Sequence, residues 1–307
     1  MSKKLVGLIC ALSANIIWGF ISISLRFLKS YDADQILYYR ILTSFIICLL
    51  YILFANQNKL KEDFKVFKNS SRRSFYQLAI LIFLSGIFIT LNWFAFIYVI
   101  NNVSLKSAAF AYMVCPLITA LGGFLLLKEE LTKYKITGVF IAIISIVILA
   151  RGSFYEVMWS VAIALCYAIF LIIQRVIVNI NKVNMLGYQL LIALFIITPL
   201  FFIYPQPIPT SFSFWFDIVI ISVLFTIIPL LLSLYALEQL PSSTVGILIY
   251  INPVVAFTVA FFYFNERIDI NQFFAYSLLV IAVIVFNFRI LCDSFIKLKS
   301  PKVFNPN

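Results

Sequence analysis

Hydrophobic residues form ten long runs along the chain, separated by short polar or charged breaks. Each run is close to the length that an α-helix needs to cross a bilayer, about 20 residues. The pattern therefore predicts an all-α integral membrane protein with ten transmembrane helices. The predicted spans lie near residues 5–28, 36–55, 77–99, 104–127, 135–150, 158–178, 186–204, 216–238, 243–264 and 271–291.

The composition agrees with this interpretation. Of the 307 residues, 64% are hydrophobic and 11% are charged, and the mean hydropathy is +1.07. A water-soluble protein of this size could not bury so many apolar side chains. Ten spans of about 20 residues leave room only for short loops and tails, so we expect no separate soluble domain.

The chain lacks the residues that several kinds of chemistry require. It contains no histidine, and its five cysteines are scattered without a CxxC pair, so no metal, cofactor or disulfide framework is expected. All 12 acidic residues fall near the edges of apolar runs or outside them. With no histidine or carboxylate at mid-depth to carry a proton, we expect facilitated diffusion or exchange rather than proton antiport.

The formal net charge of +11 comes from residues in the breaks between runs, where Lys and Arg report membrane orientation rather than nucleic-acid binding. With a cytoplasmic N-terminus, 17 of the 23 basic residues face the cytoplasm. This asymmetry predicts that both termini are cytoplasmic, in agreement with an even number of spans. The six basic residues on the other side are Arg26, Lys29, Arg40, Lys106, Arg151 and Arg267.

The two halves of the sequence resemble each other. A shift of 137 aligns residues 92–148 with 229–285, pairing Pro116 with Pro253 and Glu129 with Glu266. A shift of 149 aligns the earlier part, pairing Trp18 with Tyr167 and Arg26 with Arg175.

Each half holds five predicted spans, an odd number, so the second half must enter the membrane from the opposite side. Such inverted repeats are typical of secondary transporters, whose substrate site lies at mid-depth between the halves. The alternative is chance similarity between two apolar sequences. We predict one five-helix repeat at 1–155, a second at 156–292, and a short basic cytoplasmic tail at 293–307.

Polar and aromatic residues mark helical faces that should not meet lipid. Small and hydroxylated residues there commonly serve close helix packing, whereas an unsatisfied amide in hydrocarbon costs several kcal/mol. We predict a substrate cavity between spans one, three, four, six, eight and nine, where aromatic faces contact apolar substrate parts and amides fix orientation. The predicted lining residues are Trp18, Ser22, Asn92, Trp93, Phe96, Tyr112, Tyr167, Tyr250 and Asn252.

Gating or helix bending is predicted for Gly19, Arg40, Pro116 and Pro253. Each proline removes a backbone donor and frees a carbonyl one turn earlier; the alternative is a static kink. Arg40 lies a few residues inside the second predicted span. An arginine there either extends to the lipid headgroups or acts on an anionic substrate or gate.

Several short motifs follow one another in a recognisable order. They are Trp18-Gly19, Ala33-Asp34-Gln35-Ile36-Leu37 with Arg40, Asn92-Trp93 with Val99-Ile100-Asn101-Asn102, Pro116, Glu129-Glu130-Leu131, Tyr250, Pro253 and Glu266-Arg267. Together they resemble the RarD-type branch of the EamA family, in the drug/metabolite transporter superfamily. The resemblance implies a multi-pass permease of the bacterial inner membrane, similar to the proteins labelled chloramphenicol-sensitivity proteins. The chain departs from the motif at Lys128 and Asn265, where glycine is typical, which leaves the geometry of both loops open.

The sequence thus predicts a secondary, non-ATP transporter that exports or exchanges a small metabolite or drug-like molecule by alternating access. Its partners would be that molecule and the bilayer; a monomer is compatible with the sequence. An integral membrane enzyme such as a prenyl transferase would need clustered Asp, Glu or His at the membrane surface, which the sequence lacks. A receptor or scaffold would tolerate substitutions such as Asn92→Leu.

Overall fold

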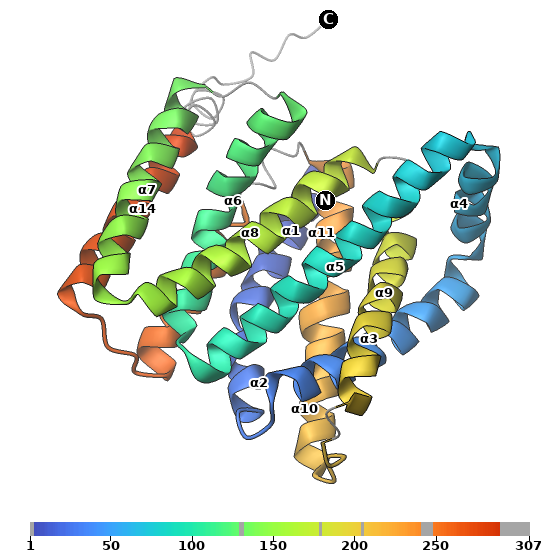
Figure 1. The fold of residues 1–307 in the computed structure, drawn as a ribbon, viewed down its shortest axis with the longest axis horizontal. Coiled ribbons are helices and arrows are strands. Elements are labelled where there is room, and N and C mark those ends of the chain that lie inside the picture. The colour runs from blue at the N-terminus through green and yellow to red at the C-terminus, as the bar shows by residue number, and fades with distance from the viewer. Residues whose placement is uncertain (1–2, 129–131, 178–179, 204–205, 241–247, 289–307) are drawn as a thin grey trace, which may run out of the picture.

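The computed structural model describes residues 3–128, 132–177, 180–203, 206–240 and 248–288. Within these ranges the chain is built from helices joined by short loops (Figure 1). Two of the elements, η1 and η2, are single π-helical turns inside longer helices. The elements are α1 (Lys3–Gly19), α2 (Ile21–Phe27), α3 (Ala33–Ala55), α4 (Gln57–Asn69), α5 (Arg72–Asn102), α6 (Leu105–Leu127), α7 (Lys133–Gly152), α8 (Phe154–Val176), α9 (Lys182–Ile203), α10 (Phe212–Ser222), η1 (Val223–Ile227), α11 (Ile228–Gln239), α13 (Ile251–Thr258), η2 (Val259–Tyr263) and α14 (Ile270–Phe286).

The helices match the predicted spans closely. Eight described segments are long and apolar enough to cross a membrane, and two shorter apolar helices cover Ile251–Tyr263 and Ile270–Phe286. The chain is therefore a multi-pass membrane protein, while the count of ten crossings stays a prediction. The predicted tail at 293–307, Glu129-Glu130-Leu131 and the side chain of Arg175 lie outside the described residues.

Short polar residues set where several helices begin. The Ser104 hydroxyl accepts a hydrogen bond from the Ser107 N–H at the start of α6, and Ser153 does the same for Glu156 at the start of α8. Asp269 and Gln272 form a reciprocal capping box at the start of α14. Because each cap satisfies backbone donors that have no partner in the first helical turn, consecutive helices can follow one another through very short loops.

The outer surface of the bundle is apolar. Phe140 on α7, Phe195 on α9 and Phe262 in η2 are 64%, 72% and 83% exposed. Side chains of this kind have no polar group to satisfy, so they suit contact with lipid acyl chains. The polar residues that the sequence places on inner helical faces are buried, among them Asn15, Ser22 and Asn92.

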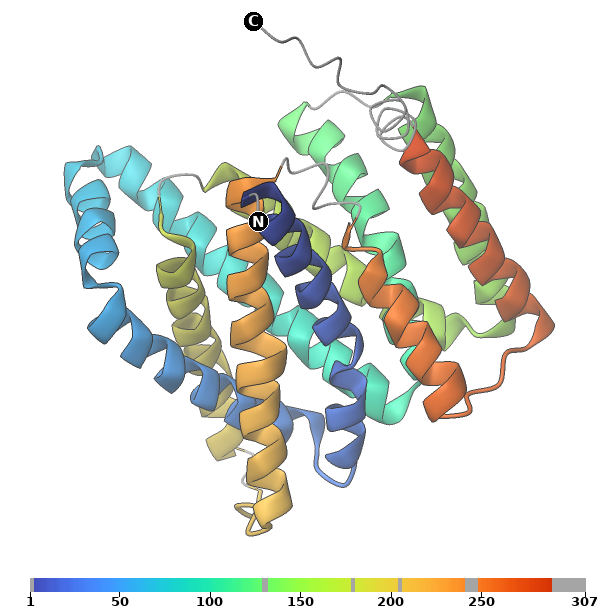
Figure 2. The same ribbon diagram turned by 180° about the vertical axis from the view of Figure 1, so that it is seen from behind.

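The helices of the two halves pack on each other in matching pairs. Helix α1 packs against α11 and α13, as α8 packs against α5 and α6. Helix α3 contacts α9, and α7 lies along α14 at one edge of the bundle (Figures 1 and 2). The main contacts of the bundle therefore run between residues 3–152 and residues 154–286 rather than within either half.

The loop between α3 and α5 contains a separate amphipathic helix, α4. Its buried Asp63 accepts hydrogen bonds from the backbone N–H of Asn181 (3.0 Å) and the side chain of Asn184 (2.6 Å). Asn56 donates to the side-chain oxygens of the same two asparagines. This hydrogen-bond network joins α4 to the start of α9, at the end of the bundle opposite the α13–α14 loop (Figure 1).

Two loop positions that carry glycine in the resembled motif adopt the left-handed conformation that favours glycine. Lys128 has φ = 57° and Asn265 has φ = 51°, and the described residues contain no other non-glycine residue with positive φ. Their separation of 137 equals the repeat shift. The loop geometry left open by the sequence is thus the glycine-type geometry at both positions, adopted by other residues.

This conformation predicts a stabilising substitution. A side chain with a Cβ in the left-handed region costs about 1–2 kcal/mol, and asparagine less. After the greater chain entropy of glycine is subtracted, Lys128→Gly is expected to stabilise the protein by about 0.5–1 kcal/mol, and Asn265→Gly by less. Thermal unfolding in detergent measures both. Lys133→Gly, inside the first turn of α7, is the control and should destabilise; a fall in unfolding temperature for Lys128→Gly would contradict the strain.

Candidate functional site

Asn92 of α5 is the centre of a buried contact between the two halves. It is 1% exposed, and its side-chain amide donates to the Ile163 carbonyl of α8 at 3.0 Å. The Tyr112 hydroxyl of α6 donates to the Asn92 carbonyl oxygen at 3.4 Å. Both polar ends of the amide therefore have partners, as burial in an apolar bundle requires.

An aromatic group surrounds this amide. The Tyr112 ring lies edge-on to Phe96, with centroids 5.3 Å apart, and edge-on to Tyr167 of α8 at 5.6 Å. Edge-to-face contacts at these distances are favourable for aromatic pairs. The structure thus brings together four of the predicted lining residues from α5, α6 and α8.

A second group forms where α1 meets η1. The indole Nε1 of Trp18 donates to the Phe225 carbonyl at 3.1 Å. Within the same π-helical turn, the Thr226 hydroxyl donates to the Ile221 carbonyl, five residues back, at 2.9 Å. Single π-turns inside α-helices frequently lie at functional sites, and here the turn directs a carbonyl and a hydroxyl to neighbouring helices.

Arg40 of α3 belongs to this second group and does not extend to the membrane surface. It is 5% exposed, and its Nε and Nη2 atoms donate to the Thr226 hydroxyl oxygen at 3.2 and 3.1 Å. Its guanidinium lies over the Trp93 ring, 5.3 Å from the centroid. Trp93 directly follows Asn92 in α5, which links the two groups into one.

We call Trp18, Arg40, Asn92, Trp93, Tyr112 and Thr226 the central cluster. Four of its contacts join a residue before position 153 to one after it: Trp18 to Phe225, Arg40 to Thr226, Asn92 to Ile163, and Tyr112 to Tyr167. The cluster is therefore built at the interface of the halves rather than inside one of them.

The charge of Arg40 is incompletely compensated. Taking a cation out of water costs several kcal/mol even after the protein relaxes. A desolvated cation–π contact returns about 2 kcal/mol, and a neutral hydroxyl adds about 1 kcal/mol. The Nη1 atom is buried without a hydrogen-bond partner. The site thus holds a positive charge whose surroundings favour an incoming negative group.

Three further predicted lining residues lie on α2 and at the start of α13. The Ser22 hydroxyl on α2 and the Tyr250 hydroxyl before α13 are buried without a partner. Asn252 is partly buried in the first turn of α13. These three residues complete the predicted lining set, and none of them is among the hydrogen-bond partners of Arg40 in the described part of the chain.

The two matched prolines have different local settings. Pro116 lies inside the continuous helix α6. Pro253 instead lies in the first turn of α13, after a turn at residues 249–250. A proline in a first turn interrupts no intrahelical hydrogen bond, because its N–H would have no partner there. The ninth predicted span is thus broken just before Pro253, whereas the fourth is not.

Gly19 allows α1 and α13 to approach closely. A Cβ atom at this position would lie 2.5 Å from the Val255 Cβ and 3.2 Å from the Asn252 carbonyl oxygen. Only a residue without a side chain fits this contact. Gly19 therefore sets the distance between α1 in the first half and α13 in the second half.

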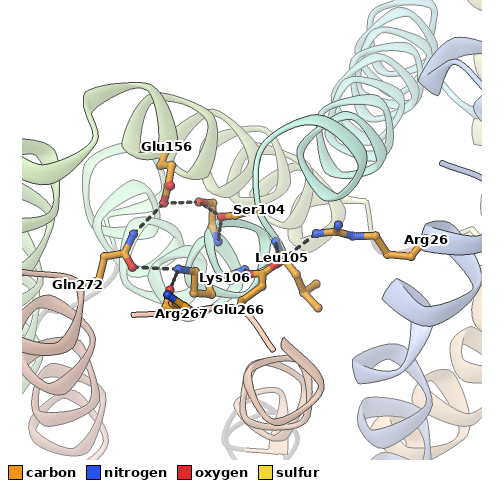
Figure 3. A network of polar contacts seen from close by, with 9 residues as sticks. Arg26, Ser104, Leu105, Lys106, Glu156, Glu266, Arg267 and Gln272 are labelled. Atoms are coloured by element: carbon orange, nitrogen blue, oxygen red, sulfur yellow. Dashed lines mark hydrogen bonds and ion pairs between the residues drawn. The ribbon is translucent and has the colours of Figure 1, made fainter. Parts of the chain in front are cut away.

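A polar network joins the halves at the end of the bundle where α2 ends and α6 and α14 begin (Figure 3). At its centre, the Glu266 carboxylate pairs with Arg26 at 2.9 Å. The same carboxylate accepts hydrogen bonds from the backbone N–H groups of Leu105 (3.0 Å) and Lys106 (3.2 Å). An anion at a helix N-terminus is stabilised by the helix dipole and by the free N–H groups.

The network continues to α8 and α14. The Lys106 ammonium donates to the Arg267 carbonyl and to the Gln272 side chain, the latter at 2.9 Å. Glu156 of α8 accepts from Ser107 at 2.9 Å and from Gln272 at 3.5 Å. We call these residues, with Arg26, Leu105 and Glu266, the closure network, because they connect α2, α6, α8 and α14 across one end of the bundle (Figure 3).

The sequence did not predict the closure network. It marked Glu266 as a repeat landmark and Arg26 as part of a polar stripe, but their partners lie up to 240 positions away in the chain. The available signal was chemical: unlike charges at the ends of predicted spans on the same side of the membrane. Within the described ranges, no group of three or more His, Cys, Asp or Glu residues is arranged to hold a metal ion.

The sequence matches the EamA-like transporter family twice, over residues 5–151 and 154–288. The chain belongs to this family. As a member of the EamA-like transporter family, it has a match in each half, and the boundary between the two matches falls in the short loop between α7 and α8.

Relatives support this assignment along nearly the whole chain. The chain is 28% identical over 292 residues to the uncharacterized transporter YojE of Bacillus subtilis, covering 92% of this chain and 93% of that protein. It is 23% identical over 287 residues to protein RarD of Escherichia coli, covering 91% and 93%. These similarities identify it as an EamA/RarD-type drug/metabolite transporter.

A solved crystal structure, described simply as "Crystal structure of protein", has the same fold. It superimposes with a TM-score of 0.61 over 94% of this chain and 98% of its own, at 14% sequence identity. At this identity the likeness shows the fold alone.

Proposed function

We propose that the protein is a secondary transporter that carries a small metabolite or drug-like molecule through a site at the central cluster. The observation that carries this proposal is that four contacts of the cluster cross between the halves. A site made by two bodies that move against each other changes shape when they do, which is the requirement of alternating access. Membership of a transporter family supports the same conclusion.

The proposal includes ten crossings in two inverted halves. The packing pairs support it, because the repeat shifts exchange α1 with α8 and α5 with the α10–α11 helix. This exchange converts the α1–α11 contact into the α5–α8 contact, and both are among the principal contacts of the bundle. A pseudo-two-fold relation between the halves explains such reciprocity, and five spans in each half make that relation an inversion.

The direction of closure follows from the charges. Basic residues are in excess at the end of the bundle where α1 begins, which predicts that this end faces the cytoplasm of a bacterial cell. The closure network, at the opposite end, would then lie on the outer side. The described state would then be sealed from outside by Glu266 and its partners. Substrate would exchange with the cytoplasm in this state.

We propose exchange or facilitated diffusion as the mode of transport. The chain has no histidine, and no carboxylate is among the hydrogen-bond partners of the central cluster. The cluster therefore offers no ordinary proton carrier at neutral pH. Uphill transport driven by a pH gradient in proteoliposomes would contradict this mode.

Metabolite profiling tests the function. Cells that overproduce the protein should change the medium concentration of at least one small molecule, and vesicles containing the purified protein should exchange that molecule. Asn92→Leu and Trp18→Ala should each reduce the exchange rate by about tenfold or more, because each leaves a polar group without its partner in the site.

The control is Phe195→Leu, at a lipid-exposed position of α9, which should stay near the wild-type rate. A scaffold or receptor without transport activity predicts no exchanged molecule. It also predicts that neither Asn92→Leu nor Phe195→Leu changes the metabolite content of the medium or of the vesicles.

A further inference from the structure

We infer that the transported molecule carries a carboxylate or phosphate group and that Arg40 binds it. This inference rests on the transport function proposed above and names its substrate class. The observation behind it is a buried guanidinium in the central cluster that has donors to spare and no counter-ion.

The spare donors are specific. A guanidinium has five N–H groups in a planar fork that matches the two oxygens of a carboxylate or phosphate. In Arg40, Nε and Nη2 both point to one hydroxyl oxygen, that of Thr226, and Nη1 is buried with no partner. Trp93 covers a face of the guanidinium, and Nη1 is the nitrogen that retains unused donors.

No acidic side chain in the described part of the chain neutralises this charge. The ion pairs found there are Arg26–Glu266 and Lys59–Glu62. Asp34 lies six positions before Arg40, about 9 Å along the helix, and its carboxylate accepts from Gln206. Asp217 of α10 is nine residues before Thr226, about 13 Å away along the axis, and forms none of these ion pairs.

The second half of the chain provides an internal comparison. Arg40 corresponds to Gln189 at the repeat shift of 149. Gln189 is 4% exposed and donates to the Ser85 hydroxyl at 3.2 Å, while the hydroxyl of Ser222, the counterpart of Ser85, donates to the Arg40 carbonyl at 3.1 Å. The same helix contact is thus made with a neutral side chain in one half, so the packing of the fold does not require a charge at this position.

The surroundings also indicate the chemical character of the bound molecule. The Trp93 ring lies against the guanidinium, and the Trp18 indole is bonded to Phe225, the residue before Thr226. Aromatic rings at these positions suit an apolar or aromatic portion next to the anionic group. Arginine is the residue that favours planar recognition of an oxyanion, because lysine lacks the fork. We therefore expect Lys at position 40 to replace it only in part.

The first test needs no knowledge of the substrate. Arg40→Met keeps an unbranched apolar side chain at this position but removes the guanidinium, with its charge and its contact with Trp93. Because no acidic side chain in the described ranges pairs with this charge, the purified variant should unfold in detergent at a temperature equal to or above that of wild type. If Arg40 served the fold alone, the variant would unfold at a clearly lower temperature, and that result would overturn the inference.

The second test measures which compounds are carried. Vesicles with and without the protein are incubated with an equimolar mixture of small carboxylates, phosphate esters, amines and neutral alcohols, and their contents are measured by mass spectrometry. Enrichment should be confined to compounds with an oxyanion and should disappear for their methyl esters. Arg40→Met should lower it by at least about tenfold, Arg40→Lys by less, and Gln189→Leu, the repeat-matched control, by no more than about twofold.

The outcomes separate the two proposals. Enrichment of amines or alcohols that Arg40→Met leaves unchanged would overturn the assignment of an anionic substrate while supporting transport. Absence of any enrichment by the wild-type protein, in vesicles and in profiled cells, would overturn the transport function itself and this inference with it.

Discussion

Substitution of Glu266 by glutamine is expected to open the end of the bundle at which the closure network lies. The Glu266 carboxylate is three-quarters or more buried, pairs with Arg26, and accepts two backbone N–H groups at the start of α6. Glutamine keeps the shape but loses the negative charge. Hydrogen bonds to charged groups contribute about 1.5–3 kcal/mol, and the helix dipole adds to them, so the variant should lose about 3 kcal/mol of closure energy.

A loss of this size changes the balance between states by about a hundredfold. The measurement is the labelling rate of a cysteine at position 22 by a membrane-impermeant thiol reagent, in a chain whose five native cysteines are replaced. Ser22 is 1% exposed in the closed arrangement. Glu266→Gln should therefore accelerate labelling strongly.

The matched control for this prediction is Glu62→Gln. Glu62 also forms an ion pair, with Lys59 at 2.8 Å, but both side chains are more than half exposed on α4. Exposed pairs contribute little, so this variant should label at the wild-type rate. Equal labelling rates for Glu266→Gln and Glu62→Gln would show that the closure network does not hold this end of the bundle closed.

The helices themselves were predictable from the sequence, because the apolar runs have the length that the bilayer imposes. Some helices extend beyond the predicted ends of their apolar runs, where capping residues and charged side chains allow it. Helix α5 begins at Arg72 rather than near 77, since the Ser71 hydroxyl accepts from the Ser74 N–H and the arginines can lie among headgroups. Span boundaries predicted from hydropathy alone miss such polar first turns.

The central cluster was predictable in part. Asn92, Trp18 and Tyr112 stood out because polar or amphipathic groups in apolar helices need partners. Their actual partners, the Phe225 and Ile163 carbonyls, are backbone atoms that no side-chain pattern reveals. The π-turn that aims Thr226 at Arg40 also has no local sequence signal, because it depends on how α10 and α11 pack on the other half.

Arg40 shows where sequence reasoning reaches its limit. From the sequence, an arginine a few residues inside a span can extend to the headgroups or point inward. The choice depends on whether neighbouring helices cover it, and α5 and η1 do so through Trp93 and Thr226. Both neighbours are distant in sequence, so only the assembled bundle decides between the alternatives.

Replacement of Gly19 by alanine is expected to disable the protein through a single added methyl group. That Cβ would lie 2.5 Å from the Val255 Cβ, 2.6 Å from its Cγ1 and 3.2 Å from the Asn252 carbonyl oxygen. The Val255 Cβ and the Asn252 carbonyl oxygen are held by the α13 backbone and cannot rotate away, so α1 and α13 must separate. Overpacking of this kind costs about 3 kcal/mol, and the shift would displace Trp18, one residue earlier, from its bond to Phe225.

The measurement combines thermal unfolding with the exchange rate in vesicles, and both should fall. Gly122→Ala is the control, because the atom that its Cβ would meet first, at 2.4 Å, is the terminal Cδ1 of Ile172, which a rotamer change can move at low cost. It should therefore stay close to wild type although its nominal contact is equally short.

A second-site substitution tests the cause. Val255→Gly removes both close side-chain atoms of the contact, so Gly19→Ala with Val255→Gly keeps one Cβ at the crossing but moves it to the other helix. The glycine costs about 1 kcal/mol in α13, yet the double variant should exceed Gly19→Ala in unfolding temperature and exchange rate. Such non-additivity is expected only for residues in direct contact. If the two losses simply add, Gly19 acts through something other than the distance between α1 and α13.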